Sequence, residues 1–159
     1  METHKTCSVF GHSRIKITSE LIDKLSILFE HLIIKRIVKY FYFVGLGEFD
    51  NCCWEIITKL RHKYPQIQRI FLVPDPRWIN LNKRLKWLKQ DDYEEIVYLD
   101  IKFDYWYTRI HYRNCEIINH SDFIVFYVNH SEKSGVYKAM QYAIKNKKEI
   151  INVCCYKKS

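Results

Sequence analysis

The sequence predicts an α/β protein with a mostly parallel sheet of about six strands. Strand-sized apolar runs alternate with helical stripes from one end of the chain to the other. Several runs are continuously apolar, as is typical of strands that helices cover on both faces. Strand–helix alternation implies right-handed crossovers and therefore parallel strands. The 159 residues contain no visible repeat, linker or low-complexity tract, so residues 1–159 are expected to form one domain.

The helices between these strands begin at recognisable capping residues. Thr18 or Ser19 can cap the first helix, which carries a stripe of leucines on one face. Asp50 is expected to cap a second helix that ends near residue 62, before Pro65. A last helix is expected from about residue 134 to 146. The expected strands, in chain order, are residues 6–10, 40–44, 69–73, 95–100, 123–128 and 149–153.

Residues 74–92 have the least regular pattern of the chain. Asp75-Pro76-Arg77 marks a turn, and the leucines and basic residues that follow predict a short helix with a basic outer face. Such a segment can form a lid over a site or an ordinary crossover helix, and the pattern leaves both alternatives open.

The composition favours an anionic partner and argues against a membrane span. The net charge is +8, which suits a nucleotide, a nucleic acid or an acidic surface, although a solvated lysine-rich face explains it equally well. No apolar run reaches 18 residues, so no transmembrane segment is expected. The chain begins without the features of a signal peptide, which favours a cytoplasmic location. The six cysteines lack zinc-ligand spacing and are expected to be reduced, mostly buried thiols, so neither a metal nor a cofactor is expected.

Three strand-to-helix junctions carry the candidate site, because the carboxyl ends of parallel strands meet at one edge of the sheet. At the first junction, Gly11 is expected to let the backbone approach a ligand, His12 and Ser13 are polar, and Arg14 offers a fork for a phosphate or carboxylate. A plain turn with exposed side chains is the alternative for this loop.

The second junction, residues 45–50, is glycine-rich. Gly45 and Gly47 make it similar to a dinucleotide fingerprint, but Asp50 stands where the third glycine belongs, so that fingerprint is weak. A tight loop that delivers Glu48 and Asp50 to the sheet edge fits better. Asp50 can instead serve only as the helix cap, and Glu48 can simply face solvent.

The third junction runs from Asn129 to Val136. Ser134 and Gly135 stand at the expected start of the last helix, where backbone N–H groups and the helix dipole favour an anion.

Arg113 stands out between the fourth and fifth strands. On a helical wheel it falls about 20° from Trp106, inside an apolar stripe, with Asn114 beside it. A buried arginine needs an anionic partner, because an unpaired buried charge is unfavourable. That partner is either an internal carboxylate, Asp122 or Asp50, or a ligand phosphate.

Together these motifs resemble the YpsA-like branch of the SLOG superfamily, which is related to the LOG and DprA proteins. The motifs that carry the resemblance are 7–14, 43–50, 63–65, 112–114, 121–123 and 147–153. The resemblance implies a Rossmann-like three-layer sandwich and recognition of a nucleotide-derived ligand at the carboxyl edge. It implies the binding residues Gly11, His12, Arg14, Gly45, Gly47, Glu48, Asp50, Arg113, Asn114, Ser134 and Gly135.

The chain departs from the LOG pattern at the catalytic position. Ala139 stands where LOG enzymes carry the glutamate that supports glycosidic cleavage, Val136 replaces a threonine, and Ser134 replaces a glycine. The resemblance therefore leaves it uncertain whether the chain is an enzyme.

The leading expectation is a protein that senses, carries or sequesters a nucleotide-derived small molecule. Arg14 and the Ser134-Gly135 helix start are expected to hold phosphates, Glu48 or Asp50 a sugar, and Phe49 or Trp78 a base. The alternatives are an N-glycosidase that uses Glu48 or Asp50 on a nucleoside monophosphate, and a binder of single-stranded nucleic acid. Relatives also imply a homodimer.

Overall fold

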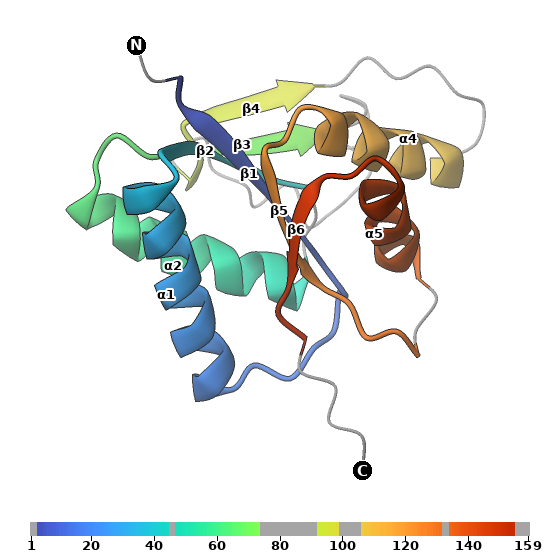
Figure 1. Ribbon diagram of the computed structural model, residues 1–159, viewed down its shortest axis with the longest axis horizontal. Helices are drawn as coiled ribbons and strands as arrows, with labels where there is room; N and C mark the ends of the chain where they lie inside the picture. Colours follow the sequence, from blue (N-terminus) through green and yellow to red (C-terminus); the bar gives the residue numbers. More distant parts are fainter. Residues whose placement is uncertain (1–2, 45–46, 74–91, 99–105, 132–133, 155–159) are drawn as a thin grey trace.

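The computed structural model describes residues 3–44, 47–73, 92–98, 106–131 and 134–154, with the backbone alone for 106–109. Within them the chain forms an α/β sandwich with a parallel sheet of six strands, in the order β4-β3-β2-β1-β5-β6 (Figure 1). The predicted α/β class and the Rossmann-like three-layer sandwich are confirmed. The strands are β1 (Lys5–Gly11), β2 (Val38–Phe43), β3 (Gln68–Val73), β4 (Glu95–Tyr98), β5 (Phe123–Tyr127) and β6 (Glu149–Asn152).

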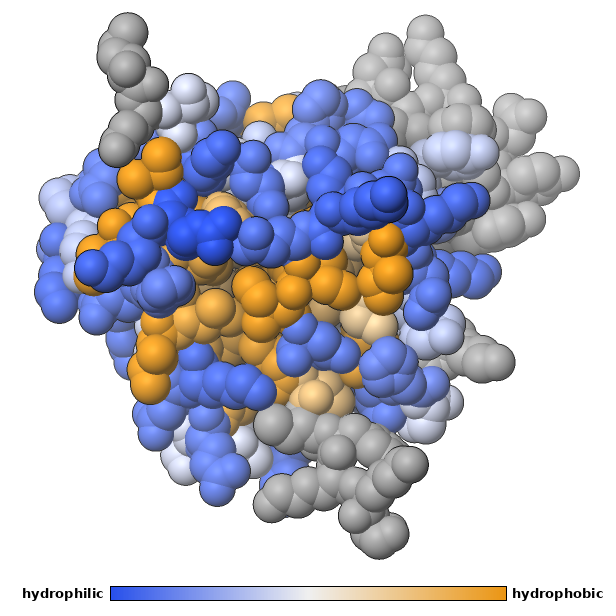
Figure 2. All heavy atoms as spheres, in the orientation of Figure 1, coloured by the Kyte–Doolittle hydropathy of each residue, from blue (hydrophilic) through white to orange (hydrophobic). Residues whose placement is uncertain are grey.

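Helices cover both faces of this sheet. One layer holds α1 (Ser19–Lys35) and α2 (Glu48–Lys63), and the other holds α4 (Trp106–Asn119) and α5 (Gly135–Lys145) (Figure 1). Two buried clusters fill the spaces between layers, one around Phe29 and Phe41 and one around Phe10 and Phe126. Figure 2 shows that apolar surface on this view gathers over the edge strand β6, between α1 and α5.

The predicted cap of the first helix is confirmed, and that of the second is wrong. The Thr18 hydroxyl accepts from the Leu21 amide at 3.1 Å at the start of α1, and Ser134 caps α5. The second helix begins at Glu48 with Gly47 at the N-cap, so Asp50 lies inside its first turn and does not cap it. The Glu48 amide donates to the Ser13 carbonyl at 2.8 Å, and this tertiary contact starts the helix before Asp50 is reached.

The strand order places a topological switch point between β1 and β5. The chain proceeds from β1 outward through β2, β3 and β4, then returns through α4 to pair β5 with the other side of β1. Ligands of open α/β sheets bind outside the carboxyl ends of strands at such a point. Among the described residues, no helix is long and apolar enough to cross a membrane.

Candidate functional site

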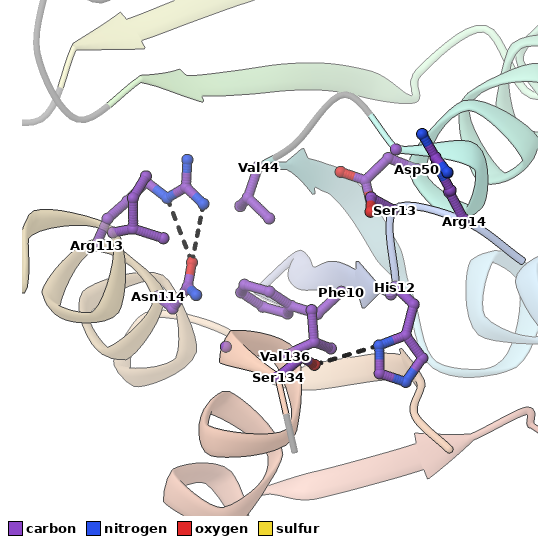
Figure 3. Close-up of a pocket in the computed structure, with 14 residues that line it drawn as sticks. Phe10, His12, Ser13, Arg14, Val44, Asp50, Arg113, Asn114, Ser134 and Val136 are labelled. Carbon is purple, nitrogen blue, oxygen red and sulfur yellow. Dashed lines mark hydrogen bonds between the residues drawn. The ribbon is translucent and has the colours of Figure 1, made fainter. Parts of the chain in front are cut away.

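A cavity of about 450 Å³ opens at the carboxyl ends of β1 and β2, beside the switch point (Figure 3). Figure 3 shows Arg113 and Asn114 from α4 on one side and Asp50, Ser13 and Arg14 on the other. The described residues that line the cavity are Phe10, Gly11, His12, Ser13, Arg14, Val44, Gly47, Asp50, Ile110, Arg113, Asn114, Ser134, Gly135 and Val136.

The structure thus brings ten of the predicted site residues to one cavity. Glu48, Phe49 and Asn129 are described but are not among its lining residues. Gly45, Trp78 and the rest of the predicted lid segment (74–91) lie outside the described residues. The prediction missed the apolar floor of the cavity, which consists of Phe10, Val44, Ile110 and Val136. The position of Phe10 and Val44 at the ends of predicted strands is a signal that could have identified them.

Glycine is required at position 11 by packing within the protein, and not by the approach of a ligand as predicted. A Cβ atom at this position would lie 2.3 Å from the Phe49 ring, and Phe49 itself is fully buried and packs against Tyr127. Phe49 therefore belongs to the core, and the expectation that it stacks on a base is wrong. The close approach at Gly11 is between β1 and α2.

Glu48 fastens the first loop to the second. Its carboxylate Oε2 accepts from the Ile15 amide at 2.7 Å, while its own amide donates to the Ser13 carbonyl. Gly47 also packs tightly against the first loop, because a Cβ atom at this position would lie 2.7 Å from Ser13 Cα. The exposed Glu48 side chain thus supports the wall of the cavity from outside.

Asp50 is the carboxylate that reaches the cavity. It is 6% exposed and stands in the first turn of α2, where the helix dipole favours a negative charge. Burial raises the pKa of Tyr93 and Cys53, and the Asp50 charge adds to both shifts, whereas for Arg113 it opposes the lowering of the pKa by burial.

Arg113 is buried, at 5% exposure, as the helical wheel predicts. Its Nε and Nη2 donate to Asn114 Oδ1 at 3.3 and 3.1 Å, and its Nη1 has no hydrogen-bond partner among the described residues. Burial lowers the pKa of Arg113 from 12.5 to about 10, and the charge of Asp50 opposes this shift.

The prediction that Asp122 could be the carboxylate partner of Arg113 is wrong. Its carboxylate accepts from the Thr6 amide near the start of β1 at 2.9 Å, at the amino edge of the sheet and away from the cavity.

His12 connects the first and third loops. The Asn129 amide donates to its Nε2 at 2.9 Å, and Ser134 Oγ lies 3.2 Å from its Nδ1. Since Nε2 accepts, the ring is neutral with its proton on Nδ1, which donates to Ser134. Asn129 thus reaches the cavity only through His12. Its own Oδ1 accepts from the amide and the hydroxyl of Ser131.

No group of three histidine, cysteine, aspartate or glutamate side chains in the described ranges could hold a metal ion. Four of the five described cysteines are buried, and burial raises the pKa of Cys7 and Cys53. Cys7, Cys52 and Cys53 belong to the hydrophobic core, and none of the five lines the cavity.

Comparison of the chain with protein-family models and with curated proteins finds no match. The resemblance to the YpsA-like branch therefore stays a prediction. The fold and the site define a Rossmann-like α/β protein with a cavity of polar and apolar residues at its switch point.

Proposed function

We propose that this protein binds a nucleotide or a nucleotide-derived small molecule in the cavity, as a sensor, carrier or sequestering protein. The observation that carries the proposal is Arg113, a nearly fully buried guanidinium that lines the cavity with Nη1 unpartnered among the described residues. A buried charged donor without an acceptor is unfavourable by roughly 1–3 kcal/mol or more. A phosphate or another anionic group in the cavity supplies that acceptor.

The α4 side of the cavity is a surface of donors. Asn114 Oδ1 already accepts two hydrogen bonds from Arg113, so its amide nitrogen remains as the polar group that can meet a ligand. A guanidinium and an amide nitrogen side by side suit phosphate oxygens, because both are donors and one is charged. Ser134 is the N-cap of α5 and lines the same cavity, so the first backbone N–H groups of that helix lie at the cavity as well.

The remaining walls suit the other parts of a nucleotide. Asp50 offers a carboxylate that can accept from sugar hydroxyls, and Phe10, Val44 and Val136 form an apolar floor for a base. A volume of about 450 Å³ falls within the range of small-molecule sites.

Thermal melting with a ligand panel tests the proposal. AMP, GMP, their cyclic forms and ADP-ribose are added separately to the purified chain. A ligand at a hundred times its Kd stabilises by about 2.7 kcal/mol, equivalent to roughly 5–10 °C in a chain of this size. Arg113→Met should remove the shift. Arg36→Met, which removes the same charge from an exposed pair with Glu149, should keep it. A panel without any shift argues against the proposal.

A second function, cleavage of an N-glycosidic bond, draws support from the buried carboxylate of Asp50 in the same cavity. Glu48 is the weaker candidate for this chemistry, because its carboxylate binds the Ile15 amide. Ala139 is fully buried in the core, so its position offers no carboxylate to the cavity. Release of free base from a nucleoside monophosphate, lost in Asp50→Asn and kept in Glu48→Gln, would establish the enzyme. Binding without any base release would establish the sensor or carrier.

Binding of single-stranded nucleic acid and formation of a homodimer stay predictions.

A further inference from the structure

We infer that His12 is a positioning residue whose neutral ring holds the β5–α5 loop and the start of α5 in place at the cavity. The inference rests on the proposed function in one respect, that the cavity is the ligand site. The positioning itself follows from hydrogen bonds that exist without a ligand.

The hydrogen bonds of His12 define a single protonation state. The Asn129 amide can only donate, so Nε2 must carry a lone pair, and in the neutral ring the proton then sits on Nδ1. Nδ1 donates to Ser134 Oγ, which in turn accepts from the Tyr137 amide at 3.5 Å and caps α5. One imidazole therefore links the end of β1 to both ends of the loop that precedes α5.

The His12 backbone strengthens this link. Its amide donates to the Tyr127 carbonyl at 3.4 Å, and its side chain is 6% exposed. The backbone bond extends the β1–β5 pairing, whose last register pair is Gly11 and Tyr127. The backbone therefore holds His12 beside β5, and the ring reaches across to α5.

Protonation of the ring is incompatible with this arrangement. An imidazolium donates at both nitrogens, so Nε2 would face the Asn129 N–H and the hydrogen bond would break. Acidification that protonates the ring should therefore release the loop.

Among the described residues, the charged groups that line the same cavity as His12 are Arg14 on the same loop, Asp50 on α2 and Arg113 on α4. Tyr127 on β5 accepts from the His12 amide through its carbonyl, and Tyr137 on α5 donates its amide to Ser134. The proposal depends on the hydrogen bonds, whichever of these charges prevails.

Two kinds of measurement test the inference on the full-length chain. NMR of the ¹⁵N-labelled protein at pH 7.5 should show His12 protonated at Nδ1 and a coupling across the hydrogen bond between the Asn129 amide nitrogen and Nε2. On acidification, protonation of Nε2 and loss of this coupling should occur together. The opposite tautomer, or an Asn129 amide that does not respond to ring protonation, would overturn the inference.

The second measurement is the affinity for sulfate, an anion whose charge is constant between pH 5.5 and 7.5. If His12 acts only through its charge, protonation should tighten sulfate binding. If it positions the loop, binding should weaken by about fivefold, the equivalent of one lost hydrogen bond. Tighter binding at pH 5.5 therefore refutes the inference.

Two substitutions divide the roles of the ring nitrogens. His12→Gln keeps an acceptor near the Nε2 position but cannot be protonated, so the pH dependence should vanish. His12→Asn keeps a polar group only near Nδ1, so the Asn129 contact should be lost at every pH. If either variant fails to fold, the wild-type NMR measurement still decides. Absence of sulfate binding at pH 7.5 would count against the proposed function. The NMR measurement on the wild-type protein would then still test whether His12 positions the loop.

Discussion

Replacing Arg113 by methionine should stabilise the ligand-free protein and abolish ligand binding. Arg113 is 5% exposed, and within the described part of the chain its side-chain hydrogen bonds are the two to Asn114 Oδ1 beside it. Methionine retains most of the apolar stem and removes the buried charge. The site therefore retains an unfavourable group that a ligand is expected to satisfy, as in other cases in which function opposes stability.

The magnitude follows from the shift of its pKa. Burial lowers the pKa of Arg113 from 12.5 to about 10, against the opposing charge of Asp50. A shift of this size corresponds to about 3 kcal/mol. Because the folded pKa lies below the unfolded one, the folded chain binds this proton less tightly, and the penalty is complete at every pH below about 10. Loss of the Asn114 hydrogen bonds offsets part of the gain, which leaves about 1–2 kcal/mol.

Urea unfolding and thermal melting at pH 7 measure this effect. A gain of about 1–2 kcal/mol corresponds to a rise in Tm of roughly 2–8 °C for a chain of this length. The matched control is Arg69→Met. Arg69 is also 5% exposed, but it binds both carboxylate oxygens of Glu94, with its Nη2 2.7 Å from Oε2. Its removal takes the guanidinium hydrogen bonds from Glu94, which keeps Arg61 at 3.1 Å, and should destabilise by about 1–3 kcal/mol. If Arg113→Met destabilises as much as Arg69→Met, Arg113 is an internal structural charge and the case for a ligand fails.

Two further predictions concern packing and pH. Gly11→Ala should destabilise by about 1–3 kcal/mol through overpacking against Phe49, whereas Gly135→Ala, where a Cβ meets nothing within 4 Å, should leave the melting temperature nearly unchanged. Equal effects of the two changes would contradict the packing explanation. Burial acts to raise the pKa of Glu94, but hydrogen bonds and charge from Arg69 outweigh it and the net shift is downward from 4.5. The stabilisation by this pair should therefore be complete above pH 4.5 and lost as the pH falls below it. Chemical unfolding between pH 3 and 7 should show that acidification lowers the free energy of unfolding less in Arg69→Met than in the wild type. An equal loss in both proteins would refute the role given to the Arg69–Glu94 pair.

The fold was predictable because its signals are local and repeated. Every predicted strand is present among the described residues, and its described ends differ from the prediction by at most two positions, because continuous apolar runs define strands that are buried on both faces. Residues 99–100 of the predicted fourth strand lie outside the described residues. The start of α2 was not predictable. The local sequence favours Asp50 as the cap, but the helix starts at Glu48 because its amide meets the Ser13 carbonyl. A contact between residues 35 positions apart leaves no trace in the local pattern.

The site was predictable in its location and less so in its details. Parallel topology alone brings the three junctions together, and helical periodicity alone places Arg113 on a buried face. Gly11 shows the limit of this reasoning. A glycine that admits a ligand and one that admits the Phe49 ring look identical in sequence. Asp122 was a poor partner for Arg113 on topological grounds, because it precedes β5 and must lie at the amino edge.

The positions of the charged residues favour binding of a nucleotide over binding of a nucleic-acid strand, a choice that the net charge alone does not decide. Lys148, which follows α5, lies away from the cavity, because its Nζ donates to the carbonyls of Asn119 and Ser121, just ahead of β5 at the amino edge. It therefore adds little to an anion site at the carboxyl edge, where Arg14 and Arg113 line the cavity. A nucleic-acid strand would need basic residues along its path, since its affinity comes mainly from phosphate neutralisation. One buried guanidinium in a cavity of about 450 Å³ instead suits a compact ligand with a localised charge, which is why the proposal favours a nucleotide over a polymer.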